Sequence, residues 1–119
     1  MEQFRFLKWR VYHDAKELFS IVLAVVAKLP KEYRFELGSQ IIRSALSILL
    51  NIAEGSGKHS DKELNRFIEI SLGSVYETVA AADTMRDNRL IRQEVYGDIE
   101  KRCDDIARQL GGLKKKLVR

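Results

Sequence analysis

The sequence contains few residues that break or cross-link a polypeptide chain. A single cysteine, Cys103, excludes an intrachain disulfide and a metal site built from several thiolates. A single proline, Pro30, and seven glycines, which are clustered rather than scattered, leave room for long uninterrupted helices. This scarcity argues against a β fold with many turns and favours a helical protein.

A long hydrophobic run is also absent. The most apolar stretch, Leu18 to Ala27, lies between Glu17 and Lys28 and is much shorter than the roughly 20 residues that span a bilayer. It begins behind a charged segment, and no small-x-small cleavage motif follows it. We therefore expect neither a signal peptide nor a membrane partner, and the expected compartment is the cytoplasm.

The composition is that of one mildly basic globular domain. Hydrophobic residues make up 45% and charged residues 32% of the 119 positions, which predicts a single domain over residues 1–119. The formal net charge of +4 permits a nucleic acid or another anionic surface as partner without requiring one.

Apolar residues recur at intervals of three and four in four segments, which is the spacing of a buried helical face. The first predicted helix runs from about Phe6 to Lys28 and ends at Pro30, since proline disfavours helical geometry in the preceding residue. A connection over residues 31–35 leads to the second helix, which extends to about Glu54. The predicted core stripe of the first helix is Val11, Ala15, Leu18, Val22, Val25 and Leu29.

The third predicted helix begins at Ser60, where Ser60-Asp61-Lys62-Glu63 matches a capping box. The fourth begins at about Gln93, and Gly111-Gly112 is expected to let its last turn fray. The predicted stripe of the third helix is Leu64, Ile68, Ser71, Val75, Thr78, Ala82 and Met85. Four helices with short connections predict an all-α protein, an antiparallel up-down-up-down four-helix bundle.

The stretch EGSGKHS over residues 54–60 resembles a phosphate-binding loop but fails its requirements. His59 follows Gly57-Lys58 where a serine or threonine should stand, and Ile52 occupies the position of the first glycine. The preceding segment is a predicted helix rather than a strand. We interpret Gly55 and Gly57 as the end of the second helix and a flexible entry to the third.

No other catalytic motif is apparent. His13 and His59 belong to different segments, and Cys103 lies on the apolar stripe of the fourth helix, as expected of an inert core thiol. We therefore expect no enzymatic activity, no metal or other cofactor, and no small-molecule substrate.

The second helix carries a polar seam. Ser44 and Ser47 should face Ser71, Gly73 and Ser74 once the third helix folds back, because small residues allow close helix approach. The seam consists of Gln40, Ser44, Ser47, Asn51 and Glu54.

A charged cluster is expected where this seam meets the turn. Arg43 lies beside the seam, and we expect Glu54 to pair with Arg66 or Arg43 and so close the end of the bundle. The cluster Gln40, Arg43, Asn51, Glu54 and Arg66 is then either a packing feature or a ligand site, and the sequence leaves both interpretations open.

Residues 37–77 resemble a known family. The segment LGSQIIRSALSILLNIAEGSGKHSDKELNRFIEISLGSVYE is similar to the four-helix bundle proteins of the 23S ribosomal RNA intervening-sequence family, named after reading frames inside insertions in bacterial rRNA genes. Leu49 stands where the family usually has proline, so the expected kink is weaker. The matching residues are Gln40, Ile41, Arg43, Ser47, Ile48, Asn51, Ile52, Ala53, Glu54, Gly55, Ser60, Phe67, Gly73, Ser74 and Glu77.

The resemblance implies an all-α bundle that assembles into a homo-oligomer, commonly a ring of five. It also implies a distant relation to the accessory protein of diversity-generating retroelements, a basic pentamer that binds nucleic acid and a reverse transcriptase. For the intervening-sequence branch, the resemblance implies no settled biochemical activity.

Two functions compete. Basic residues at Lys58, Lys62 and 114–116, together with Arg119, favour a self-assembling protein that binds RNA or DNA. We expect an assembly to bring several copies of Lys114, Lys115, Lys116 and Arg119 to one side, or of Lys58 and Lys62 to the other. The N-terminal segment interleaves Phe4, Phe6, Trp9 and Tyr12 with Arg5, Lys8 and Arg10, a pattern that offers stacking and charge together.

The alternative is an oligomeric scaffold that binds a protein partner, with an incidental basic tail that merely suits the helix dipole. Surplus apolar residues off the main stripe of the first helix favour self-association under either hypothesis: Tyr12, Phe19, Leu23 and Val26.

Overall fold

The computed structural model describes residues 3–117 and places them in six helical elements with no strand in that range. This confirms the all-α class and the four long segments. The elements are the 3₁₀ helix η1 (Arg5–Lys8), the long helices α1 (Arg10–Ala27), α3 (Glu36–Ser56), α4 (Asp61–Asp87) and α5 (Gln93–Leu117), and the single turn α2 (Lys31–Arg34).

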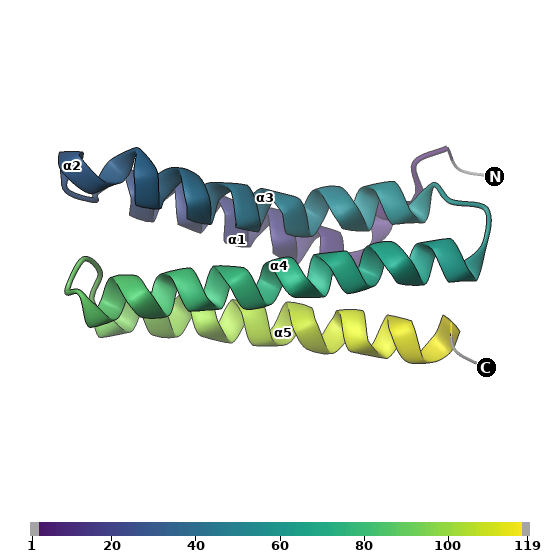
Figure 1. The fold of residues 1–119 in the computed structure, drawn as a ribbon. Helices are drawn as coiled ribbons and strands as arrows, with labels where there is room; N and C mark the ends of the chain where they lie inside the picture. The colour runs from purple at the N-terminus through teal and green to yellow at the C-terminus, as the bar shows by residue number, and fades with distance from the viewer. Residues whose placement is uncertain (1–2, 118–119) are drawn as a thin grey trace.

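The long helices lie side by side, and successive long helices run in opposite directions (Figure 1). The described part of the chain measures 46 × 24 × 19 Å. One end holds η1, the α3–α4 turn and the last turn of α5; we call it the η1 end. The other, the α2 end, holds α2 and the α4–α5 turn.

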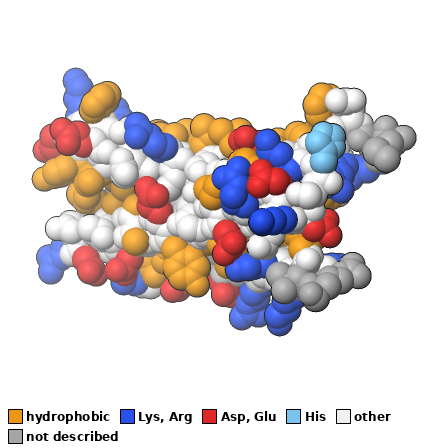
Figure 2. Space-filling model, turned by 45° about the vertical axis from the view of Figure 1, so that its right-hand side comes forward, with side chains coloured by type: hydrophobic (Ala, Val, Ile, Leu, Met, Phe, Trp, Pro, Cys, Tyr) orange, Lys and Arg blue, Asp and Glu red, His pale blue; other side chains and the backbone are white. Residues whose placement is uncertain are grey.

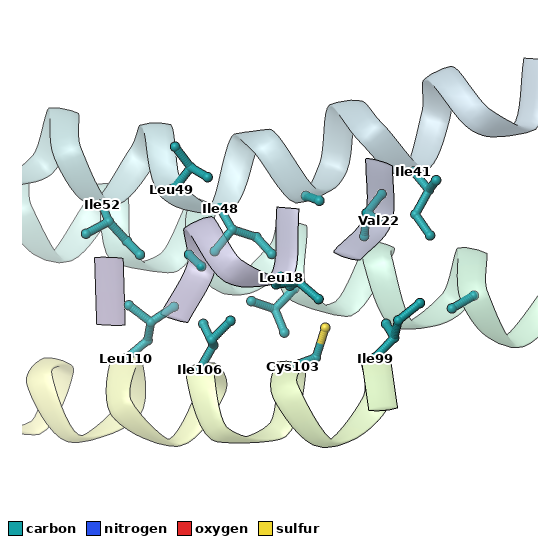
Figure 3. Close-up of a cluster of buried hydrophobic side chains, with 14 of the residues drawn as sticks. Leu18, Val22, Ile41, Ile48, Leu49, Ile52, Ile99, Cys103, Ile106 and Leu110 are labelled. Carbon is teal, nitrogen blue, oxygen red and sulfur yellow. The ribbon is translucent and has the colours of Figure 1, made fainter. Parts of the chain in front are cut away.

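One hydrophobic core runs along the molecule between the four long helices, and each of them contributes fully buried side chains (Figure 3). All seven residues predicted for the third helix stripe are buried on α4, which confirms that stripe. Side chains with almost no exposure include Leu18, Ile41, Ile48, Ile52, Ile68, Ile99, Ile106 and Leu110.

The predicted core of α1 was wrong at one position. Val26 is buried, whereas Val25 is only partly buried. The cause is a close contact with α3, because a Cβ at Gly38 would lie 2.6 Å from Cγ1 of Val26. Val26 therefore belongs to the core and not to a surplus apolar face.

Three predicted boundaries also differ from the structure. Residues 5–8 form η1, and Trp9 is extended (φ −85°, ψ 128°), so α1 begins at Arg10 and not at Phe6. Residues 31–34 form a helical turn where a plain connection was expected. Helix α5 continues through Gly111-Gly112 to Leu117, so the predicted fraying is not seen.

The sequence suggested that Gly55 ends α3, but the helix continues to Ser56. A Cβ at Gly55 would lie 2.8 Å from Cβ of Phe67 and 3.0 Å from Cδ1 of Leu64. Glycine in a helix costs about 0.5–1 kcal/mol relative to alanine, and here the close approach of α4 requires it. Gly57 is the C-cap and keeps a right-handed conformation (φ −89°, ψ 0°).

Ser60 caps α4 as predicted, because its Oγ accepts a hydrogen bond from the backbone N–H of Glu63 at 3.1 Å. The second half of the predicted capping box is not formed. The carboxylate of Glu63 instead accepts from Arg66 on the next turn of the same helix, at 3.4 Å.

Gly55→Ala should destabilise the protein by about 1–3 kcal/mol, because the new methyl group meets Phe67 Cβ, which cannot rotate away. Gly73→Ala is the matched control on α4. No atom lies within 4 Å of a Cβ built there, so this variant should gain about 0.5–1 kcal/mol from helix propensity. Urea unfolding at one fixed protein concentration measures both changes, and equal effects of the two substitutions would contradict the packing role of Gly55.

Candidate nucleic-acid interface

The polar seam of α3 faces α4 and is closed by hydrogen bonds between small side chains. Oγ of Ser44 lies 2.8 Å from Oγ1 of Thr78, and Oγ of Ser74 donates to Oγ of Ser47 at 2.8 Å. Oγ of Ser71 donates to the carbonyl of Ile48 at 2.8 Å. The predicted meeting of these two serine-rich faces is therefore confirmed.

Gly73 is the exception to that prediction. It is exposed, and no atom lies within 4 Å of a Cβ built on it, so it does not line the seam. The partner of Ser44 is Thr78, which lies one turn beyond Ser74 on α4. The hydroxyl of Thr78 donates to the carbonyl of Ser74 at 2.8 Å.

The predicted charged closure of the seam is not formed. Arg43, Glu54 and Arg66 are all exposed, and Glu54 has neither a side-chain hydrogen bond nor an ion pair with any residue in the range 3–117. Arg66 pairs with Glu63, three residues earlier, and its guanidinium lies 4.5 Å from the ring centroid of Phe67. Glu63, one turn earlier on the same helix, pairs with Arg66 in place of the expected Glu54 on α3.

The predicted polar cluster is thus two separate features. Asn51 belongs to the seam, because its Nδ2 donates to the carbonyl and the Oγ of Ser47 at 2.8 and 2.9 Å. Nε2 of Gln40 donates to Glu77 on α4 at 3.4 Å on the exposed rim. Arg43, Glu54 and Arg66 lie outside this network, so the five residues do not converge on one point.

The reactive groups of the chain are dispersed. Cys103 is buried in the core, and burial raises the pKa of its thiol to about 12, which keeps it protonated at neutral pH. Nε2 of His13 hydrogen-bonds to the carbonyl of Leu7 and not to another reactive side chain. Over residues 3–117, no three His, Cys, Asp or Glu side chains are grouped closely enough to hold a metal ion.

All the described lysines that the sequence singled out lie at the η1 end. Lys58 and Lys62 flank the start of α4, and Lys114, Lys115 and Lys116 form the last turn of α5 beside it. Nζ of Lys114 lies 3.2 Å from Oε2 of Glu69 on α4, which ties the two groups together. The prediction that they occupy opposite sides was wrong, because α4 starts at the end of the molecule where α5 finishes. Arg119 lies outside the described residues.

Sequence reasoning missed that η1 joins this surface. Nε of Arg5 donates to the carbonyl of Ser56 at 2.8 Å, which fixes η1 beside the α3–α4 turn. On its other side, Lys8, Trp9, Arg10 and Lys116 contribute to a shallow hollow of about 470 Å³ between α1 and α5. The interleaving of aromatic and basic residues marked the N-terminal segment in the sequence, but this pattern does not predict where the segment packs.

We call the resulting surface the basic end, and cations outnumber carboxylates on it. Figure 2 shows Lys and Arg side chains gathered over this half of the molecule, with Asp and Glu among them. The carboxylates are Glu54, Asp61, Glu63 and Glu69. The cations are Arg5, Lys8, Lys58, Lys62, Arg66, Lys114, Lys115 and Lys116.

A protein-family model matches nearly the whole chain. Residues 8–112 match the model of the 23S rRNA-intervening sequence protein family. The chain belongs to this family. Leu49, at the usual proline position of the family pattern, is buried within the uninterrupted helix α3.

A solved structure supports the fold of this family member. The crystal structure of a protein with unknown function from the S23 ribosomal protein family of Bacteroides thetaiotaomicron aligns with a TM-score of 0.83. The sequences are 24% identical, and the alignment covers 88% of this chain and 98% of that one, which shows a shared fold. Comparison with curated proteins finds no match. Within residues 3–117, no helix of this family member is long and apolar enough to cross a bilayer.

Thr78→Val should lower the free energy of unfolding by about 1–2 kcal/mol, because it keeps the shape of a fully buried side chain but removes its hydrogen bonds to Ser44 and Ser74. Glu54→Ala should change stability by less than about 0.5 kcal/mol, since Glu54 is exposed and unpaired in the described chain. Thermal melting compares the two. A costly Glu54→Ala would show that Glu54 has a buried partner in solution.

Proposed function

We propose that this protein is a non-enzymatic, cytoplasmic homo-oligomer that binds RNA or another nucleic acid through its basic end. The observation that carries the proposal is the gathering of basic segments far apart in the sequence, at η1, residues 58–62 and residues 114–116, at one end of the molecule. Phosphate contacts supply most of the affinity of sequence-independent nucleic-acid binding, and a surface of this charge suits them.

The scaffold behind this surface is, we infer, an antiparallel up-down-up-down four-helix bundle. Two features support it: successive long helices run in opposite directions, and each packs against two others in the cyclic order α1, α3, α4, α5. An even number of such helices brings the first and last elements to the same end, next to the α3–α4 turn.

Self-assembly is supported by apolar side chains that one copy leaves exposed. With Val26 in the core, Leu23 remains as an exposed aliphatic residue of α1, and Phe35 is 82% exposed. Other exposed large hydrophobic residues on the long helices are Leu37, Leu50, Ile70 and Tyr76. The number of subunits proposed, five, comes from the family resemblance.

Assembly would strengthen weak binding at each basic end. Lys114 is paired with Glu69, and the excess positive charge on one copy is small. Several copies joined in one ring act on the same strand at high effective concentration, which raises the overall affinity without any new contact.

A second candidate function is a scaffold that binds a protein partner. The observation in its favour is a groove of about 560 Å³ between the start of α3 and the end of α4, at the α2 end. Its apolar lining includes Leu37, Ala81, Met85 and Leu90. This groove lies away from the basic end, so the two functions can be tested separately.

Light scattering with size-exclusion chromatography should give a mass of several 13.7 kDa subunits, with five as the expected number. Phe35→Ser tests whether the most exposed aromatic side chain is part of the interface and is expected to lower that mass. A monomeric wild-type protein at working concentrations would reject the assembly.

Replacing Lys114, Lys115 and Lys116 by glutamine should weaken binding to RNA of any sequence. It should also flatten the plot of log affinity against log salt by about 0.7–0.9 for each phosphate that the variant no longer neutralises. Glu69→Gln is the matched opposite change, because it frees Lys114 from a carboxylate 3.2 Å away and should strengthen binding. Filter binding at several salt concentrations measures both variants, and melting checks that both fold. If the wild type shows no salt-dependent binding at low ionic strength, the scaffold function takes its place.

A further inference from the structure

The 3₁₀ helix η1 borders both lysine groups of the basic end. On one side Arg5 anchors it to Ser56, two residues before Lys58. On the other side, Lys8 and Trp9 share a hollow with Lys116 at the end of α5. A chain of phosphates therefore has a route along η1 between the two lysine groups, beside the direct route across α4, where Glu69 holds Lys114.

The aromatic side chains of this segment form a supported row. The rings of Phe6 and Tyr12 meet edge to face with centroids 4.8 Å apart, and those of Phe4 and Phe6 meet in the same way at 6.4 Å. Each inner ring packs against its neighbour. Phe4, at the outer end of the row, is 60% exposed.

Cations contact the inner rings of the same region. The guanidinium of Arg5 lies 5.3 Å from the ring centroid of Trp9, and Nζ of Lys16 lies 5.1 Å from that of Tyr12. No cation–π contact is seen for Phe4 among the described residues. An exposed ring on a firm base, flanked by positive charge, is the arrangement that stacks nucleic-acid bases.

We propose that Phe4 is a stacking platform for an unpaired base, so that the basic end selects single-stranded over double-stranded nucleic acid. This inference rests on the proposed function and adds its substrate class. In a duplex the faces of the bases are covered by their neighbours, so only an unpaired base can lie on Phe4 while lysines hold the adjoining phosphates. An apolar protein segment could contact Phe4, but it would have no negative charge to pair with the surrounding cations. A nucleic acid therefore fits this surface better.

Trp9 makes the test direct, because it is the only tryptophan in the chain and lies at this site. Its fluorescence can be titrated with an unstructured RNA of about 12 nucleotides, a length within the range bound by known single-strand modules. The same RNA annealed to its complement and a DNA strand of the same sequence are the other probes. The wild type should bind the single strands more tightly than the duplex.

Phe4→Ala should weaken single-strand binding by about 5-fold to 100-fold, the loss expected for one stacked base, and should leave duplex binding unchanged. Phe4→Trp should retain the single-strand preference because it keeps an aromatic face. Tyr33→Ala is the matched control: it removes an exposed aromatic side chain of α2, at the opposite end of the molecule, and should change neither affinity.

The outcomes separate the platform from the proposed function. If wild-type protein binds both strand forms equally and Phe4→Ala has no effect, the platform is wrong while nucleic-acid binding stands. If neither form binds at low salt, the proposed function itself fails. Tighter binding of the RNA strand or of the DNA strand shows which nucleic acid supplies the stacked base. In either case, Phe4→Ala must weaken single-strand binding for the platform to hold.

Discussion

The close approach of α3 and α4 is the constraint on which the rest of the structure depends. Gly55 leaves no room for a side chain between α3 and Phe67, and the hydroxyls of Ser44 and Ser47 meet Thr78 and Ser74 directly. Small residues permit this approach, and their hydrogen bonds satisfy groups that would otherwise be costly to bury. The seam thereby fixes the register of α4 against α3, and this register sets where the α3–α4 turn and its two lysines project.

The same seam explains why some of the structure was accessible from sequence. Every residue of the predicted α4 stripe is buried, because its serine and threonine residues keep the helical period of their apolar neighbours; Phe67 and Ser74 are buried beside it and were not predicted. The pairing of the serine-rich faces followed from size alone. Periodicity could not choose between Val25 and Val26, because both are apolar and the choice depends on Gly38 of another helix.

The candidate site was predicted in its parts but not in its arrangement. The lysines were identified from composition. Their common location follows from the number and direction of the helices, but the sequence analysis expected the two groups on opposite sides. The Glu54 pair failed because a sequence does not show that Glu63 holds Arg66 within α4. The place of η1 depends on one long-range hydrogen bond, from Arg5 to Ser56, 51 residues away. No local pattern reports such a contact.

The even number of long helices has a practical meaning for handling the protein. The described chain enters and leaves the molecule at the η1 end, so a purification tag or fluorophore attached to either terminus sits beside the lysines and can mask or mimic a charged ligand. The α4–α5 turn is the attachment point that lies away from the lysines. It lies at the opposite end, and Arg89 within it already adopts a left-handed conformation (φ 61°), so a glycine-rich insertion there suits the local backbone.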